Sequence, residues 1–421
     1  MADRDIYSAE QLEKIRATLK STLGEGSAQA LANLDTRFTA AESSEAAQAK
    51  KSPRKVEEPA KEAAAAVDIA AVIQEGSIKR LLETLGEVKE DPAGTRSLVA
   101  ALLQHNEVKA FHMVEALGKV SQDRELVDAL VHGIVTRKGV NPLIDALRFA
   151  VISPEAMKSL AMAIAEQGTV NHIIRSIATA PRNQEAAEII WAMEVMGKGT
   201  MEQMLESLNL MEATSPGVVI LATGVVNRKE VAIEPLVRAL GSVKGNSKAE
   251  SILAVELSRQ ADIPALITLL EKYVSDRTEA GEILVTKLVH RSLESRGRVK
   301  LLAKAAGNMR SDSSASKILA WGIIEQGDDA QLERAYPKMN AAPEARSILG
   351  LGISKKLGKI KALKLLGKDF FTASKASAQI EANLSAARKR YHWILKEVLG
   401  ESLEEKKPAS AREGLMKDLK E

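Results

Sequence analysis

The chain has 421 residues, of which 45% are hydrophobic and 27% charged, with a net charge of +3. The absence of Cys excludes disulfide bonds, thiolate metal sites and thiol nucleophiles, and 5 Phe, 4 Tyr and 3 Trp are too few for base-stacking modules. The charged start MADRDIYSAEQ and the lack of any run of about 18 apolar residues predict no secretory signal, no membrane span and a cytoplasmic location.

The first 66 residues divide into two segments. Apolar residues recur three or four apart over 8–23 and again over 28–38, which predicts amphipathic helices in an N-terminal segment, 1–39. Residues 40–66 mix charges with Ala, Ser and Pro and hold no apolar residue larger than Val, so we expect a flexible tether there. A charged tail, 401–421, is expected at the other end.

From residue 67 to residue 400 an apolar pattern repeats. Segments such as VNPLIDAL (140–147) and IEPLVRAL (233–240) place apolar residues at i, i+3, i+4 and i+7, which is one stripe of an α-helix. The pattern covers 284 residues in nine steps, a mean near 31.6, and the longest step, from Ile263 to Val299, suggests either drift or an extended helix or loop. The ten anchors are Ile78, Ala110, Val140, Val170, Met201, Ile233, Ile263, Val299, Leu332 and Ala362.

A second helix follows the first in each repeat, and polar residues mark its start. They suit the N-cap and the first turn, and they occur at Ser153-Pro154-Glu155, Asn183-Gln184-Glu185, Ser215-Pro216, Asn246-Ser247, Asp276 to Glu279, Asp312-Ser313 and Pro343-Glu344. Glycines before the next anchor predict left-handed C-caps at Gly76, Gly139, Gly168, Gly199, Gly297, Gly327 and Gly358. The sequence therefore predicts an all-α fold, a right-handed α-solenoid of about ten helix pairs.

This pattern resembles the short-period HEAT-like α-solenoids over residues 70–400. Pro142, Pro235 and Pro264 lie near the Leu stripe of the first helix, as in HEAT repeats. The chain departs from that family because its units are shorter and because the family's recurring Asp in the turn and Arg in the second helix are not evident. Phycobilin lyases and a group of DNA glycosylases have related solenoids and are enzymes, but we find no motif that carries their activities onto this chain.

No pattern in the chain indicates a catalytic, cofactor or metal site. Gly197-Lys198-Gly199-Thr200 is interpreted as a turn between repeats, since a phosphate-binding loop needs a longer motif after a strand. Gly350 and Gly352 are interpreted as small residues that allow close helix packing. The six His show no metal-ligand spacing.

Two of the three Trp are expected to belong to the core of the repeats. Trp191 lies 21 residues after Val170 and Trp321 lies 22 after Val299, so both occupy nearly the same position of the second helix. Trp393 lies in the basic and aromatic run RKRYHW, for which packing and a contact surface both remain open.

Charge is distributed unevenly along the chain. Residues 285–400 hold 22 Lys and Arg against 10 Asp and Glu, a local excess of 12 positive charges, so the remainder carries −9. Lys361, Lys364 and Lys368 are spaced to share one helix face. The candidate binding surface comprises Lys355, Lys356, Lys359, Lys361, Lys364, Lys368, Arg388, Lys389, Arg390, Arg291, Arg296 and Arg298.

These features favour a non-enzymatic scaffold or adaptor that binds protein partners, possible acidic ones included, with the N-terminal helices on their tether as a second attachment point. One alternative is binding of a nucleic-acid backbone or another anionic surface through the basic region 285–400. A weaker alternative is a lyase or glycosylase type of enzyme on a related solenoid. The bland interpretation of the basic region is a solvated end of the array.

Overall fold

The computed structural model of the chain describes residues 68–88, 90–137, 139–228, 231–294, 299–357, 359–367, 369 and 377–401. All regular elements in these ranges are helical, which confirms the all-α prediction. None of these helices is long and apolar enough to cross a membrane. The predicted N-terminal segment, the tether and residues 402–421 of the predicted tail lie outside the described residues.

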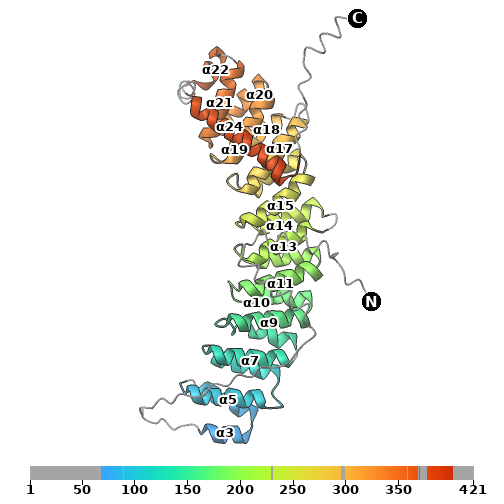
Figure 1. Ribbon diagram of the computed structural model, residues 1–421, viewed down its shortest axis with the longest axis vertical. Coiled ribbons are helices and arrows are strands. Elements are labelled where there is room, and N and C mark those ends of the chain that lie inside the picture. Colours follow the sequence, from blue (N-terminus) through green and yellow to red (C-terminus); the bar gives the residue numbers. More distant parts are fainter. Residues whose placement is uncertain are drawn as a thin grey trace, which may run out of the picture. The chain divides into compact units, whose positions relative to one another are not determined.

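Contacts divide the chain after Arg228 into two units. The helices of the first unit are coloured blue to green in Figure 1. They are α3 (Ile69–Glu75), α4 (Ile78–Glu87), α5 (Pro92–Gln104), α6 (Ala110–Val120), α7 (Arg124–Thr136), α8 (Val140–Ala146), α9 (Pro154–Gln167), α10 (Val170–Thr179), α11 (Glu185–Lys198), α12 (Met201–Leu210) and α13 (Pro216–Val226).

The second unit begins at Lys229 and continues the same alternation. Its elements are α14 (Ile233–Ser242), α15 (Ser247–Gln260), α16 (Ile263–Lys272), α17 (Glu279–Glu294), α18 (Val299–Ala306), α19 (Ser314–Gln326), α20 (Asp329–Ala335), the 3₁₀ turn η1 (Tyr336–Met339), α21 (Pro343–Leu357), α22 (Lys359–Leu366), α24 (Ser377–Trp393) and the π-helical turn η2 (Ile394–Val398).

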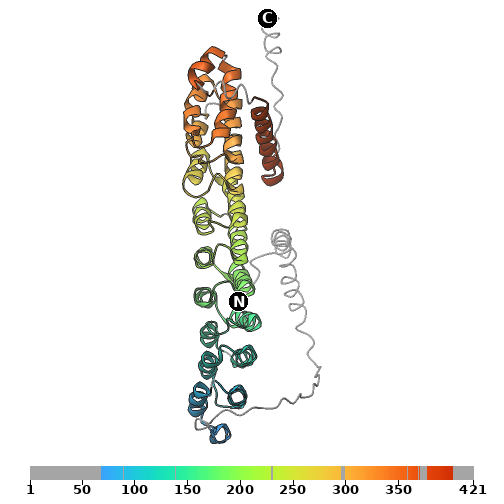
Figure 2. The same cartoon turned by 90° about the vertical axis from the view of Figure 1, so that its left-hand side faces the viewer.

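Helices stack on their second neighbours within each unit. We call the even-numbered helices from α4 to α22 the A helices and the odd-numbered ones from α5 to α21 the B helices. Each B helix packs on its own A helix and on neighbouring B helices; α11 contacts α9 and α13, and α19 contacts α17 and α21. Figure 2 shows A and B helices as two adjacent columns within each unit. This sequential packing is a solenoid-like arrangement.

The predicted register agrees with the helix starts over most of the chain. Eight of the ten anchors, from Ile78 to Val299, are the first residues of A helices. The last two predictions are three residues late, because α20 begins at Asp329 and α22 at Lys359, ahead of Leu332 and Ala362. Both helices begin with a charged residue, so the first apolar residue of the stripe does not mark their start. The long repeat is in part an extended helix, since α17 has 16 residues where α15 has 14.

The predicted caps are confirmed at several B helices. Ser153, Ser215, Asn246 and Ser313 each accept a hydrogen bond from a backbone N–H in the first turn of the following helix. The three helix-A prolines fall on the second or third residue of their helices, where the ring displaces no helical hydrogen bond.

Two aspartates that we predicted as caps of their own repeat instead bind the next one. Asp276 Oδ2 accepts hydrogen bonds from the backbone N–H groups of Arg310 and Ser311, while Thr278 caps α17. Asp312 Oδ1 accepts one from the N–H of Glu344, at the start of α21. These carboxylates therefore connect the turns of consecutive repeats, a role that resembles the recurring Asp whose absence we had inferred.

The left-handed C-cap prediction is right at some glycines and wrong at others. Gly76 and Gly139 have φ of 65° and 145°. Gly168, Gly199 and Gly327 have φ of −93°, −79° and −72° and are extended. Any Cβ at these three positions would lie 2.5 Å from the carbonyl oxygen of the residue four positions earlier, which explains Gly there without a left-handed backbone. Gly297 and Gly358 lie outside the described residues.

Glycines inside B helices allow neighbouring B helices to approach closely. A Cβ on Gly322 would lie 2.6 Å from Val289 Cγ1, and one on Gly352 would lie 2.5 Å from Ile324 Cγ1. The packing interpretation is thus confirmed for Gly352, whereas Gly350 has only ordinary contacts.

We expect Gly322→Ala to lower the free energy of unfolding by about 1–3 kcal/mol, because the added methyl group overpacks the contact with α17. Gly197→Ala in α11 is the matched control, since a Cβ there meets nothing within 4 Å. This control should raise stability by up to about 1 kcal/mol through helix propensity. Urea unfolding followed by circular dichroism measures both, and equal effects of the two substitutions would contradict the packing argument.

Candidate protein-binding surface

The last described helix does not extend the stack. α24 and η2 pack against three successive B helices of the second unit, with α24 on α19 and α21 and η2 on α17. In Figures 1 and 2, α24 is the red helix that runs along the side of these repeats. The stack of A and B helices that we predicted to reach residue 400 therefore ends at α22, and residues 377–401 cover part of its B side.

Aromatic and aliphatic side chains form the centre of this contact. Tyr391 is completely buried, and its ring centroid lies 4.6 Å from that of Trp321 on α19. Ile380 and Ala387, four and eleven residues before Tyr391, are buried on the same face of α24. The π-helical turn brings the adjacent residues Ile394 and Leu395 into buried positions. Burial also raises the pKa of the Tyr391 phenol, as do Glu401 and Glu294 to a smaller extent.

Charged pairs surround this centre. Arg390 Nε lies 2.7 Å from Glu282 Oε2, Lys355 Nζ lies 2.8 Å from Glu381 Oε1, and Lys287 pairs with Glu401. Asn383 Nδ2 donates a hydrogen bond to Glu344 Oε2 at 3.4 Å. We call the stack side of this contact the α24-binding face; it is defined by Glu282, Lys287, Trp321, Glu344 and Lys355.

Lys287 is the most buried charge of the α24-binding face. It is only 7% exposed, and its ammonium group reaches the carboxylate of Glu401, just beyond η2. A buried ammonium group is costly unless it is paired. The segment that follows α24 therefore supplies the counter-charge that this B helix needs.

Two of the predicted binding residues act inside the stack. Arg291 donates hydrogen bonds to the carbonyl oxygens of Ser258, Arg259 and Ala261, which cap the end of α15. Lys356 donates in the same way to Ile324 and Gly327 at the end of α19.

The same bridge recurs in the first unit. Arg137 donates to the carbonyl oxygens of Leu103 and Val108, and Arg228 to those of Met196 and Gly199. These four basic residues lie 27 or 28 residues after the start of their A helices. The sequence did carry this signal, and our inference that no Arg recurs in the second helix was wrong.

The other predicted basic residues divide into three groups. Lys355 and Arg390 hold α24, as described above. Lys361 and Lys364 on α22 and Arg388 and Lys389 on α24 are exposed, with Lys361 Nζ 4.0 Å from Asp329 Oδ2. Lys368, Arg296, Arg298 and the side chain of Lys359 lie outside what the structure describes.

The two core Trp differ in what covers them. Trp191 is completely buried within the first unit, whereas Trp321 is buried where α24 crosses it. Their positions differ by one residue, which rotates a side chain by about 100° around a helix. The prediction that both are buried is confirmed. Trp393 is 45% exposed, with the Arg390 guanidinium 4.4 Å from its ring, and is a surface residue.

Several His have structural roles. Nδ1 of His112 and of His172 accepts the backbone N–H three residues earlier and completes a capping box at the start of α6 and α10. His105 Nε2 lies 2.9 Å from the carbonyl oxygen of Gly76. Within the described residues no group of three His, Asp or Glu could hold a metal ion.

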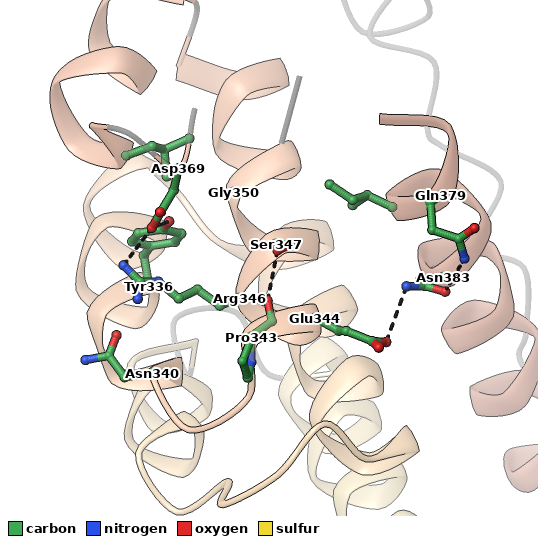
Figure 3. A pocket seen from close by; sticks show the side chains of 12 residues that line it. Tyr336, Asn340, Pro343, Glu344, Arg346, Ser347, Gly350, Asp369, Gln379 and Asn383 are labelled. Carbon is green, nitrogen blue, oxygen red and sulfur yellow. Dashed lines mark hydrogen bonds and ion pairs between the residues drawn. The ribbon is translucent and has the colours of Figure 1, made fainter. Parts of the chain in front are cut away.

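A cavity of about 550 Å³ lies between η1, α21 and the first turns of α24 (Figure 3). The Tyr336 hydroxyl donates to Asp369 Oδ2 at 2.7 Å, and Arg346 Nη2 lies 2.9 Å from the same oxygen. Burial and this hydrogen bond raise the pKa of Tyr336 to about 12. Arg346, Asp369 and Tyr336 satisfy one another, so this arrangement connects η1 and α21 rather than presenting a free reactive group.

Acid is expected to weaken the docking of α24. Burial lowers the pKa of His290, which Glu401 and Glu294 raise and Lys287 and Arg291 lower further. Burial also lowers the pKa of His392, with a smaller contribution from Arg388. Both His bind protons more readily when exposed, so the docked state loses stability as the pH falls below the ordinary His value of about 6.5.

Trp fluorescence quenching by acrylamide between pH 7.5 and pH 5.5 measures this effect. We expect stronger quenching at the lower pH, and a smaller change in the double variant His290→Gln and His392→Gln. Quenching that is the same at both pH values would contradict the expectation.

No family model, curated protein or solved structure matches the chain. The candidate surface is therefore argued from the geometry of the chain itself.

Proposed function

We propose that the protein is a non-enzymatic interaction scaffold whose α24-binding face accepts amphipathic helices. The observation that supports this proposal is that a helix with its own aromatic anchor and ion pairs lies across three B helices instead of joining the stack. Helix binding on a preformed surface of this kind is a common mode of protein recognition.

The finer architecture belongs to the same proposal. We infer a right-handed, HEAT-like α-solenoid of about ten helix pairs, supported by the A and B alternation, the period and the connecting aspartates and basic caps. The N-terminal segment 1–39 on its tether would supply a second attachment point and raise the effective concentration of what it holds.

Selection from a phage-displayed library of helical peptides on the immobilised full-length chain tests this function. We expect enriched helices that carry an aromatic residue beside a basic one and that compete with a synthetic peptide of residues 377–401. The control is the double variant Glu282→Arg and Lys287→Glu, which reverses two charges of the face. No enrichment, or enrichment that is the same on this control, would contradict the proposal.

A second candidate is binding of an anionic backbone, favoured by the exposed Lys361, Lys364, Arg388 and Lys389. It predicts affinity for DNA or RNA that falls steeply with salt concentration. A gel shift at low salt that shows no complex would exclude it.

A further inference from the structure

We propose that α24 is a displaceable internal ligand: without a partner it occupies the α24-binding face, and an amphipathic helix of a protein partner binds there in its place. The inference rests on the proposed function, since it concerns the regulation and the partner class of the same surface.

The contacts of α24 allow it to leave without breaking a repeat. Its extensive contacts are with the B helices α19 and α21 and with η2, rather than with the A helices. The packing of each A helix on its B helix does not include α24, so its release leaves the repeats assembled.

The anchoring of α24 is sparse compared with that of the repeats. Only three residues of this 17-residue helix are buried, namely Ile380, Ala387 and Tyr391, whereas ten residues of the 16-residue α17 are buried. An aromatic centre with ion pairs around it is the composition of a protein–protein interface rather than of a domain core.

The face also specifies the chemistry of the partner helix. Trp321 needs an aromatic ring, Glu282 a basic residue beside that ring, and Lys355 an acidic residue about nine positions earlier, as Tyr391, Arg390 and Glu381 provide. Lys287 needs a second acid after the last turn, as Glu401 provides. A partner helix of this pattern competes with α24, which its covalent link keeps at an effective concentration of about millimolar.

The test measures binding of a fluorescein-labelled peptide of residues 377–401 to the full-length chain by fluorescence anisotropy. The variants are Tyr391→Ala and Arg390→Ala in the chain, with Ser385→Ala on the exposed side of α24 as the matched control. In a third form, Lys355→Cys and Glu381→Cys are joined by a bismaleimide; because the chain has no Cys, no other thiols react. Circular dichroism checks that each variant is folded.

We expect Tyr391→Ala to bind the peptide at least tenfold more tightly than the unaltered chain, because the open fraction sets the apparent affinity. Arg390→Ala should give a smaller gain, Ser385→Ala none, and the joined form no binding. Equal affinity in all forms would overturn the inference, since α24 would not compete. No binding even to Tyr391→Ala would overturn the proposed function as well, because the face would not accept a separate helix.

Discussion

Replacing Trp191 by Ala is expected to lower the free energy of unfolding by about 3–5 kcal/mol. The side chain is completely buried within the stack of the first unit, so its removal leaves a cavity that the neighbouring helices can only partly fill. Urea unfolding followed by circular dichroism measures the loss.

Trp393→Ala is the control for Trp191→Ala. Trp393 is exposed and contacts the Arg390 guanidinium, so its removal should cost no more than about 1 kcal/mol. Losses of similar size for the two substitutions would contradict the assignment of Trp191 to the core.

Replacing Asp276 by Ala is expected to cost about 2–4 kcal/mol. The carboxylate is buried, and its Oδ2 accepts hydrogen bonds from the N–H groups of Arg310 and Ser311 at 2.9 and 3.0 Å and from the Ser311 hydroxyl at 3.0 Å. Without it, these donors are left in a buried turn with no acceptor.

Asp276→Asn separates the hydrogen bonds from the charge. The amide oxygen of Asn still accepts from the backbone of the next turn, so we expect about half the loss seen with Ala. If Asp276→Ala unfolds at the same urea concentration as the unaltered chain, the connecting role of Asp276 is wrong.

The sequence predicted the repeat well because its register depends on local patterns. Eight anchors fall on the first residue of an A helix, and Ser153, Ser215, Asn246 and Ser313 cap the B helices as expected. Both signals depend on residues within about one helical turn of each other, which a single sequence displays directly.

Connections between repeats could not be assigned in the same way. Asp276 and Asp312 look like N-caps of their own repeat, and only the stacking shows that they accept hydrogen bonds from turns about 34 residues further along. Arg291 and Lys356 looked like surface charges because the carbonyl groups they cap belong to the preceding repeat. Their periodic recurrence was visible in the sequence and is the signal that we missed.

The position of α24 was also beyond the sequence pattern. Its buried residues, Ile380, Ala387 and Tyr391, are too few to define an apolar stripe of the repeat type. The aromatic scarcity noted at the outset has a local exception here, where Trp321 and Tyr391 meet. That pair is a tertiary contact between residues 70 positions apart, which helical periodicity does not predict.

Hydrogen exchange measured by mass spectrometry on the full-length chain tests the central claim most directly, namely that α24 is a ligand-like helix on a stack that is stable without it. We predict that amides of 377–401 exchange faster than those of α15, α19 and α21, and that Tyr391→Ala accelerates exchange in 377–401 while α15 is unchanged. Exchange of α24 at the same rate as α19 and α21, with or without Tyr391→Ala, would contradict the account.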